Sequence, residues 1–334
     1  MHNSGKIRLS MLGLPVIESL EDFSRLTHIS TLTIYNLSKN SERYYRCYEI
    51  LKKNGKTRTI SQPSKNMKGI QAWILNNILN KLAASTSSKG FEKNSSTLDN
   101  AVPHKNASAV LTLDIKDFFP NITRNKVFNV FKSIGYSNFI STIFTNLCVC
   151  KNSLPQGSPC SPKLSNLSSW GLDARIQGYV GRRTITYTRY ADDLTFSGQN
   201  VIKLVKTISF IEKIINSEGF ELNYAKTRVA GLSRAKIITG LVLSDDKIGI
   251  GKKVYKLLRA KAHYLSKKND ISEIKLVYHF NGWLAYLNSV DNNRFKKLRD
   301  YVILLIDKNP MTLIKYINIP IKDSSKDSLQ LMSV

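Results

Sequence analysis

Two adjacent carboxylates, Asp192 and Asp193, separate two runs of β-branched and aromatic residues, 184–190 and 194–197. Such residues favour extended strands, so the segment predicts a tight β-hairpin with both acids at its tip. Neighbouring carboxylates repel one another, and the pair is costly unless a cation lies between them. Arg189 is the basic residue beside them in the sequence. The chain must therefore bring a cation to this tip, or use the two acids in an Asx-type turn.

A third acid, Asp114, closes a segment in which apolar residues recur with a period of two. Leu111, Leu113 and Ile115 are expected on one face of a strand, and Asp114 near its end on the other, polar face. If the three acids meet, they suit hard divalent ions, which take oxygen ligands and can share a substrate phosphate. Two such ions can clamp the attacking and leaving oxygens of a phosphoryl transfer. The alternative is that Asp114 caps a helix.

The charge of the chain indicates a polyanionic partner. Fifty Lys and Arg against 24 Asp and Glu give a net charge of +26, and nucleic acid is the usual partner of so basic a folded protein. With 42% apolar residues, the chain is expected to fold. We find no bilayer-length apolar stretch and no secretory signal, so we expect a cytoplasmic protein without a membrane partner. The four cysteines are expected to be ordinary buried or half-buried thiols.

Other patterns predict the elements around these acids. A basic hairpin is expected with its turn at Asn54–Gly55. Apolar residues at helical spacing predict a helix over 70–82, and another helix is expected to be capped near Thr123. Ser161, followed by Pro162, indicates the N-cap and first turn of a further helix.

Three segments resemble motifs of reverse transcriptases. The segment 190–193 (YADD) resembles the box that carries their paired acids, and 113–120 (LDIKDFFP) resembles their first palm motif. Between them, 154–159 (LPQGSP) resembles the fingers–palm motif. Three motifs in the family's order, on a predicted strand, loop and hairpin, are far more specific than one. The resemblance spans residues 50–260.

Two further segments narrow the resemblance to retron reverse transcriptases of the enterobacterial type. Residues 100–104 (NAVPH) resemble their Asn-Ala-x-x-His signature, and Thr239–Gly240 resembles their Val-Thr-Gly signature, with Ile238 replacing the Val. The resemblance implies an RNA-directed DNA polymerase that copies part of a partner noncoding RNA into multicopy single-stranded DNA. That DNA would be primed from a guanosine 2′-hydroxyl through a 2′,5′ branch. It also implies antiphage defence beside an effector protein encoded nearby, and removal of the copied RNA by a host ribonuclease H.

The resemblance assigns the acids to metal binding. Asp114 and Asp192 would ligate two Mg²⁺ ions, for which Mn²⁺ can substitute, and Asp193 would complete the site.

The resemblance also assigns residues that would hold the deoxynucleoside triphosphate. Phe119 would act as a steric gate against a ribose 2′-hydroxyl, and Gln156 would lie over the incoming nucleotide. Arg58 would hold the triphosphate, and Lys226 would protonate the departing pyrophosphate. Each has a simpler interpretation, as a core aromatic, a turn glutamine or a solvated charge.

The C-terminal third carries a basic row at three- and four-residue steps. A solvated helix face is the usual fate of such a row. In a polymerase thumb it would follow the phosphates of the template–primer duplex or of a structured RNA stem. The residues of the row are Lys252, Lys256, Arg259, His263 and Lys267.

We therefore expect an α+β right-hand polymerase with a ferredoxin-like antiparallel palm sheet and a helical thumb. N-terminal helices and fingers would occupy 1–108, the palm 109–240 with a fingers insertion around 125–165, and the thumb and RNA-recognition region 241–334. A group II intron-like reverse transcriptase is one alternative, although those chains usually continue into further domains. A catalytically inactive RNA-binding protein on the same fold is another.

Overall fold

The computed structural model describes residues 2–51, 55, 57–244 and 247–319. Asn54 of the predicted hairpin turn and the last residues of the predicted 241–334 region lie outside them. The chain divides into two compact units, 1–234 and 235–334. This division falls near the expected palm–thumb boundary, and the finer domain limits stay predictions.

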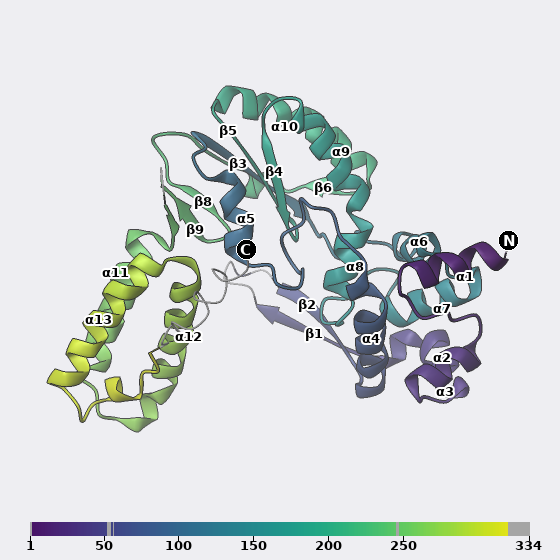
Figure 1. Ribbon diagram of the computed structural model, residues 1–334, viewed down its shortest axis with the longest axis horizontal. Coiled ribbons are helices and arrows are strands. Elements are labelled where there is room, and N and C mark those ends of the chain that lie inside the picture. Colours follow the sequence, from purple (N-terminus) through teal and green to yellow (C-terminus); the bar gives the residue numbers. More distant parts are fainter. Residues whose placement is uncertain (1, 52–54, 56, 245–246, 320–334) are drawn as a thin grey trace, which may run out of the picture. The chain divides into compact units, whose positions relative to one another are not determined.

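The first unit is built on an antiparallel sheet with the strand order β4-β5-β3-β6, and β7 also pairs with β3 (Figure 1). Helices separate β3 from β4 and β5 from β6, so the chain runs β-α-β-β-α-β. This is the ferredoxin-like arrangement that was predicted for the palm. The strands are β3 (Ala109–Lys116), β4 (Thr186–Tyr190), β5 (Asp193–Gly198), β6 (Glu221–Leu222) and β7 (Arg228–Ala230).

The predicted acidic hairpin is present. Tyr190 of β4 pairs with Asp193 of β5 around a turn in which Ala191 has a left-handed φ of 58°. On its other side, β5 pairs with β3 so that Asp193 lies opposite Asp114. The register of these two pairings brings the three acids to one end of the sheet.

The prediction that one face of β3 is polar and solvent-facing is wrong. Val110 and Asp114 lie on that face and are buried, as are the apolar residues of the other face. Helix α10 (Val201–Ser217) packs against β3 and β5. The segment of α5 (Thr97–Ala101) and η3 (Val102–His104) packs against β4 and β5. His104 of η3 covers the face that was expected to be polar, where its ring nitrogens hydrogen-bond to the hydroxyls of Ser197 (2.7 Å) and Thr188 (2.8 Å).

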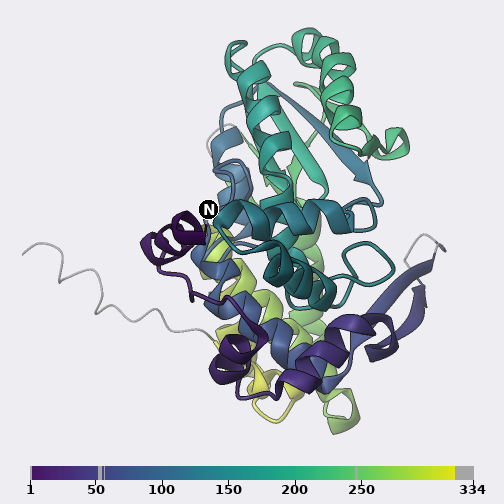
Figure 2. The same ribbon diagram turned by 90° about the vertical axis from the view of Figure 1, so that its right-hand side faces the viewer.

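Helices such as α9 and α10 pack on the sheet, and the N-terminal helices, in purple, lie apart from it (Figure 2). The buried apolar residues of these helices and of the sheet form one core. In the N-terminal part α3 and α4 pack against α7, and α1 packs against α6. The helices of the first unit are α1 (His2–Met11), α2 (Leu20–Thr27), α3 (Thr31–Lys39), η1 (Ser41–Tyr44), α4 (Lys65–Asn77), η2 (Leu79–Lys81), α5 (Thr97–Ala101), η3 (Val102–His104), α6 (Arg124–Ile134), α7 (Asn138–Cys148), α8 (Ser161–Ser168), α9 (Trp170–Gly181), α10 (Val201–Ser217) and η4 (Tyr224–Lys226).

Two local predictions need correction, and a third is confirmed in position. The helix predicted over 70–82 ends at Asn77 and is followed by a 3₁₀ turn. Cys160, not Ser161, is the N-cap of α8, although Pro162 lies in its first turn as predicted, and the Ser161 hydroxyl donates to the carbonyl of Pro155 (2.7 Å). Thr123 is the N-cap residue of α6, as predicted, although its side chain makes no capping hydrogen bond.

A separate hairpin of β1 (Tyr45–Leu51) and β2 (Thr57–Pro63) confirms the predicted basic hairpin. Most of its residues are exposed. The peptide N–H of Ser61 donates to the carbonyl of Gln156 (2.8 Å), which ties the base of this hairpin to the 154–159 loop.

The second unit combines a small antiparallel sheet, in the order β10-β9-β8, with three helices that pack on one another. Its elements are β8 (Lys236–Ile238), β9 (Leu241–Leu243), β10 (Ile248–Gly249), α11 (Gly251–Leu265), η5 (Ile271–Glu273), α12 (Ile274–Val290), α13 (Asn292–Lys308) and η6 (Leu313–Tyr316). Among the described residues of both units, no helix is both long enough and apolar enough to span a bilayer.

Candidate active site

A cavity of about 510 Å³ opens at the acidic end of the palm sheet. Its wall comes from β2, the end of β3 and the turn after it, the 154–159 loop, the hairpin tip and the segment around η4. Most of the residues predicted to handle metal and nucleotide line this one cavity. They are Arg58, Asp114, Phe119, Gln156, Asp192 and Lys226.

The acids at this end of the sheet are held close by the backbone. The peptide N–H of Ile115 donates to the carbonyl of Asp192 (3.0 Å), which fixes the hairpin tip against the end of β3. Burial raises the pKa of Asp192, and the charge of Asp114 raises it further. Burial also raises the pKa of Asp193 to about 6, with added repulsion from Asp192 and Asp114. The carboxylates therefore repel one another, which is the electrostatic situation that favours a bound cation.

Two of the three acids, Asp114 and Asp192, open into the cavity, and Asp193 does not line it. Across the described residues, no three His, Cys, Asp or Glu side chains are arranged to hold a metal ion by themselves. Two carboxylates do fit a divalent ion that takes its remaining oxygen ligands from a substrate phosphate and water, as Mg²⁺ commonly does. Participation of Asp193 stays a prediction.

Asp114 has partners that the sequence did not indicate. The ammonium group of Lys226 donates to its Oδ2 (2.7 Å), and the side-chain amide of Asn223 donates to its Oδ1 (3.0 Å). Burial lowers the pKa of Lys226, but the hydrogen bond and charge of Asp114, with the other two acids, raise it overall. Lys226, and not Arg189, which is next to the acids in the sequence, therefore supplies the positive charge at Asp114.

Arg189 is fully buried and turns away from the acids. Its Nε and Nη2 donate to the two carboxylate oxygens of Asp173 on α9 (2.8 Å each), and its Nη1 donates to Asn166 (3.1 Å) and to the carbonyl of Ala191 (3.2 Å). The last bond holds the residue with the left-handed backbone at the hairpin tip. Arg189 therefore positions the tip from behind.

The segment 87–92 completes this support. The side-chain amide of Asn166 donates to the carbonyl of Gly90 (2.7 Å). A Cβ at Gly90 would lie 2.9 Å from the backbone nitrogen of Ala191, so this close approach requires glycine. The next residue, Phe91, lines the cavity with its ring centroid 6.0 Å from that of Phe119.

Phe118 and Phe119 lie in different environments. Phe118 is buried and packs against Phe220, with ring centroids 5.6 Å apart. Phe119 is half-buried and faces the cavity. That position suits a gate against the sugar, a role that stays a prediction.

Gln156 and Arg58 line the cavity from two neighbouring segments, the 154–159 loop and β2. A Cβ at Gly157 (φ 132°) would lie 2.7 Å from the carbonyl oxygen of Ser61, so glycine lets the 154–159 loop pack against β2. Arg58 is exposed on β2, and its charge lowers the pKa of Asp192 against the larger effect of burial. Its charge therefore acts at the cavity in which Arg58 was predicted to hold the triphosphate.

The predicted basic row lies on or directly after α11 in the second unit, and all five of its side chains are exposed. The Arg259 guanidinium lies 4.5 Å from the ring centroid of Tyr301. Exposure on one helix is compatible with binding phosphates and with simple solvation, so the role of Lys252, Lys256, Arg259, His263 and Lys267 stays a prediction. Of the cysteines, Cys47 is exposed, and the expectation that all four are at least half-buried is wrong for it.

Sequence analysis missed Asn223, Phe91 and Asp173. Asn223 stands three residues before Lys226, a spacing that could have drawn attention to it. Phe91 follows a lone glycine, and Asp173 has the pattern of an ordinary helix acid. Nothing in these short patterns marks either residue as part of a site.

Comparison with known proteins gives concordant matches. Residues 50–258 match the family described as reverse transcriptase (RNA-dependent DNA polymerase). The chain is 46% identical to the Retron Ec86 reverse transcriptase of Escherichia coli, over 92% of this chain and 97% of that protein. It is 30% identical to the Retron Mx65 reverse transcriptase of Myxococcus xanthus, over 87% of this chain and 73% of that protein.

Proposed function

The chain belongs to the reverse transcriptase family and, within it, to the retron enzymes, and we propose that it copies part of a partner noncoding RNA into multicopy single-stranded DNA. It is an RNA-directed DNA polymerase that uses nucleotide substrates. The proposal concerns the RNA that it copies, the primer that it extends and the residues that do the chemistry.

One observation carries the assignment of the site. Six predicted residues from five separate segments line a single cavity at the acidic end of the palm sheet. Reverse transcriptases generally use divalent metal ions. We assign Mg²⁺, with Mn²⁺ as a substitute, to Asp114 and Asp192, with Asp193 beside them. When bound, the ions would lower the pKa of the attacking hydroxyl and neutralise charge on the phosphates.

We assign the other cavity residues to the nucleotide. Arg58 supplies a positive charge at the cavity, with which it would hold the triphosphate. Phe119 would act as the gate against a ribose 2′-hydroxyl, and its half-buried ring at the cavity supports this role. Lys226 would donate a proton to the leaving pyrophosphate, and its hydrogen bond to Asp114 supports this role.

The retron relatives support a self-primed reaction. We propose that synthesis starts from a guanosine 2′-hydroxyl of the partner RNA, which leaves a 2′,5′ branch, and that a host ribonuclease H removes the copied RNA. We further propose a cytoplasmic role in antiphage defence with an effector protein encoded nearby. The 46% identity to a retron enzyme over nearly its whole length favours this over a group II intron-like reverse transcriptase.

The test uses the full chain with the RNA transcribed from the DNA beside its gene, Mg²⁺ and labelled deoxynucleotides, without an added primer. We expect labelled DNA that stays covalently attached to the RNA. Treatment with a 2′,5′-specific debranching enzyme should release this labelled DNA from the RNA. No synthesis in this reaction, together with synthesis once a DNA primer is added, would refute self-priming. Retention of RNA without any synthesis would instead support the inactive RNA-binding alternative.

A further inference from the structure

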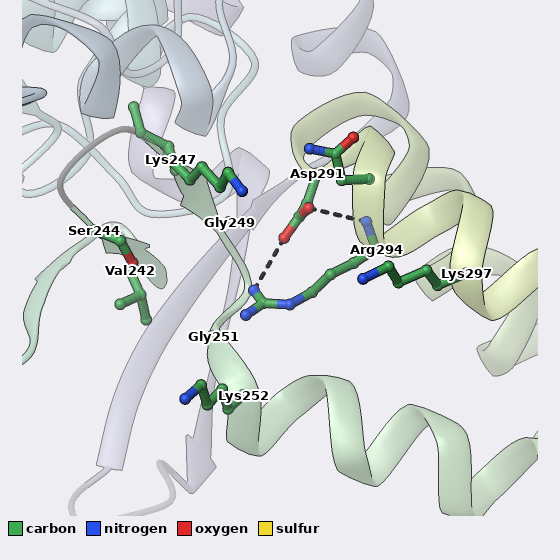
Figure 3. Close-up of a pocket in the computed structure, with 11 residues that line it drawn as sticks. Val242, Ser244, Lys247, Gly249, Gly251, Lys252, Asp291, Arg294 and Lys297 are labelled. Carbon is green, nitrogen blue, oxygen red and sulfur yellow. Dashed lines mark hydrogen bonds and ion pairs between the residues drawn. The ribbon is translucent and has the colours of Figure 1, made fainter.

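A second cavity, of about 390 Å³, lies wholly within the second unit. It is bounded by the β9–β10 hairpin, the first turn of α11 and the first turns of α13 (Figure 3). Four of its lining side chains are cationic and come from all three segments. They are Lys247, Lys252, Arg294 and Lys297.

Asp291 is the acid that lines this cavity among the described residues, and its charge is already compensated. Its Oδ1 accepts the peptide N–H of Arg294 (3.2 Å) as the N-cap of α13, and its Oδ2 accepts Nη1 of the same arginine (3.0 Å). None of the three lysines has an ion pair with a described carboxylate. Four positive charges against one negative charge leave the described lining at +3.

Glycines shape the floor of this basic pocket. A Cβ at Gly249 would lie 2.0 Å from Oδ2 of Asp291, so any other residue would displace the Asp291–Arg294 pair. Gly251 has a φ of 75°, and a Cβ there would lie 2.8 Å from a methyl of Val242. The cavity therefore depends on two residues whose replacement would close or distort it.

We propose that this basic pocket binds a phosphate group of the partner RNA, an inference that rests on the proposed function. The three lysines have no ion pair with a described carboxylate, so their charges repel one another, and a bound anion relieves that repulsion. A guanidinium and several ammonium groups together are the usual protein ligands of a phosphodiester. Lys252 belongs both to the pocket and to the basic row of α11, so a strand that follows the row would reach the pocket.

RNA is the favoured source of the phosphate because the pocket also offers neutral hydrogen-bonding groups. Ser244 and Asn293 line it and are exposed, beside the cations. A hydroxyl and an amide next to a phosphate site can bond to a ribose 2′-hydroxyl, which DNA lacks. The pocket should therefore prefer an RNA strand to a DNA strand.

The test compares two charge-matched double variants of the full chain. Lys247→Gln/Lys297→Gln removes two pocket charges. Lys253→Gln/Lys296→Gln removes two neighbouring charges that are exposed and do not line the pocket. The probe is a fluorescently labelled RNA hairpin with a stem of about 16 base pairs, and its Kd is measured over a series of KCl concentrations. In a second arm the probe is a DNA hairpin of the same sequence. In a third arm inorganic phosphate is added as a competitor of the RNA hairpin.

We expect the pocket variant to bind the RNA hairpin about tenfold more weakly and to reduce the slope of log K against log salt by about 1. The control variant should change both quantities by less than half as much, and the difference between the variants should be smaller for DNA. Equal changes in the Kd of the RNA hairpin for the two variants would overturn the inference. So would a pocket variant that differs from the control variant only in its sensitivity to inorganic phosphate and not in its Kd for the RNA hairpin. Neither result bears on self-primed synthesis, which the labelled-DNA assay tests separately.

Discussion

The ammonium nitrogen of Lys226 lies 2.7 Å from Oδ2 of Asp114, a carboxylate that is only 4% exposed. A positive side chain therefore already neutralises the acid at which we place a divalent ion. The ion and Lys226 would share this oxygen or compete for it, so the charge of one should affect the binding of the other.

Lys226→Gln should make the protein more dependent on Mg²⁺ for its stability. Without the ion, Asp114 loses its charged partner, and because Lys226 is half-exposed we expect a cost of about 1 kcal/mol. With Mg²⁺ that cost should largely vanish, since the ion compensates the carboxylate. Thermal unfolding with and without Mg²⁺ measures this, and a Mg²⁺-induced rise in Tm no larger than that of the unaltered chain would contradict it.

Phe119→Ala should relax sugar discrimination, whereas Phe118→Ala should destabilise the fold. Phe119 faces the cavity, so its removal should raise the ratio of ribonucleotide to deoxynucleotide kcat/KM by at least about tenfold, or ~1.4 kcal/mol. Phe118 is buried, and its truncation should cost about 3–5 kcal/mol. Single-nucleotide incorporation measures the first effect and urea unfolding the second. An unchanged ratio of ribonucleotide to deoxynucleotide kcat/KM in the Phe119 variant would show that the ring only packs and is no gate.

Arg189→Lys should weaken both the fold and the hairpin tip although it keeps the charge. A lysine cannot donate two parallel bonds to Asp173 and also reach Asn166 and Ala191, so we expect a loss of about 2 kcal/mol. Arg189→Met, which leaves Asp173 buried and unpaired, should cost about 3–5 kcal/mol. Urea unfolding measures both, with the exposed Arg182→Lys as the control, expected within about 0.5 kcal/mol of the unaltered chain. Equal stability of the two lysine variants would show that the fork geometry is unimportant.

His104 should make the fold sensitive to acid. Burial lowers its pKa from 6.5 to about 4, so between these values the unfolded chain binds a proton that the folded chain does not. Stability is therefore present above pH 6.5 and is lost as pH falls toward 4, by up to about 3 kcal/mol from this group. His104→Gln, which cannot titrate but can hydrogen-bond to Ser197 and Thr188, should lose less over the same range. Unfolding free energies at pH 7 and pH 4.5 test this, and equal losses in the two proteins would assign the acid sensitivity to other groups.

The strand that carries Asp114 and the hairpin that carries Asp192 follow from residue patterns alone, since a period of two and β-branched runs reflect local backbone preference. That these elements meet was implied only by the family resemblance, because it depends on the register of β3 with β5.

Contacts formed by distant segments were beyond sequence patterns. Lys226 and Asp173 resemble ordinary charged residues in the sequence, and their pairing with Asp114 and Arg189 arises when the chain folds back on itself. The prediction of a polar face on β3 was wrong for the same reason, because the segment around His104 covers that face in the folded chain.

The most direct test of the account is RNA-templated incorporation of labelled deoxynucleotides by the full chain and by Asp192→Asn, on an RNA template with a DNA primer and Mg²⁺. Glu221→Gln serves as the control, because it removes an exposed acid near the end of the same sheet. The account predicts that Asp192→Asn loses at least about a hundredfold in rate, or ~2.7 kcal/mol, with little change in stability, and that Glu221→Gln keeps near-normal activity. Incorporation by Asp192→Asn at the rate of the unaltered chain would contradict the claim that this cavity is the site of DNA synthesis.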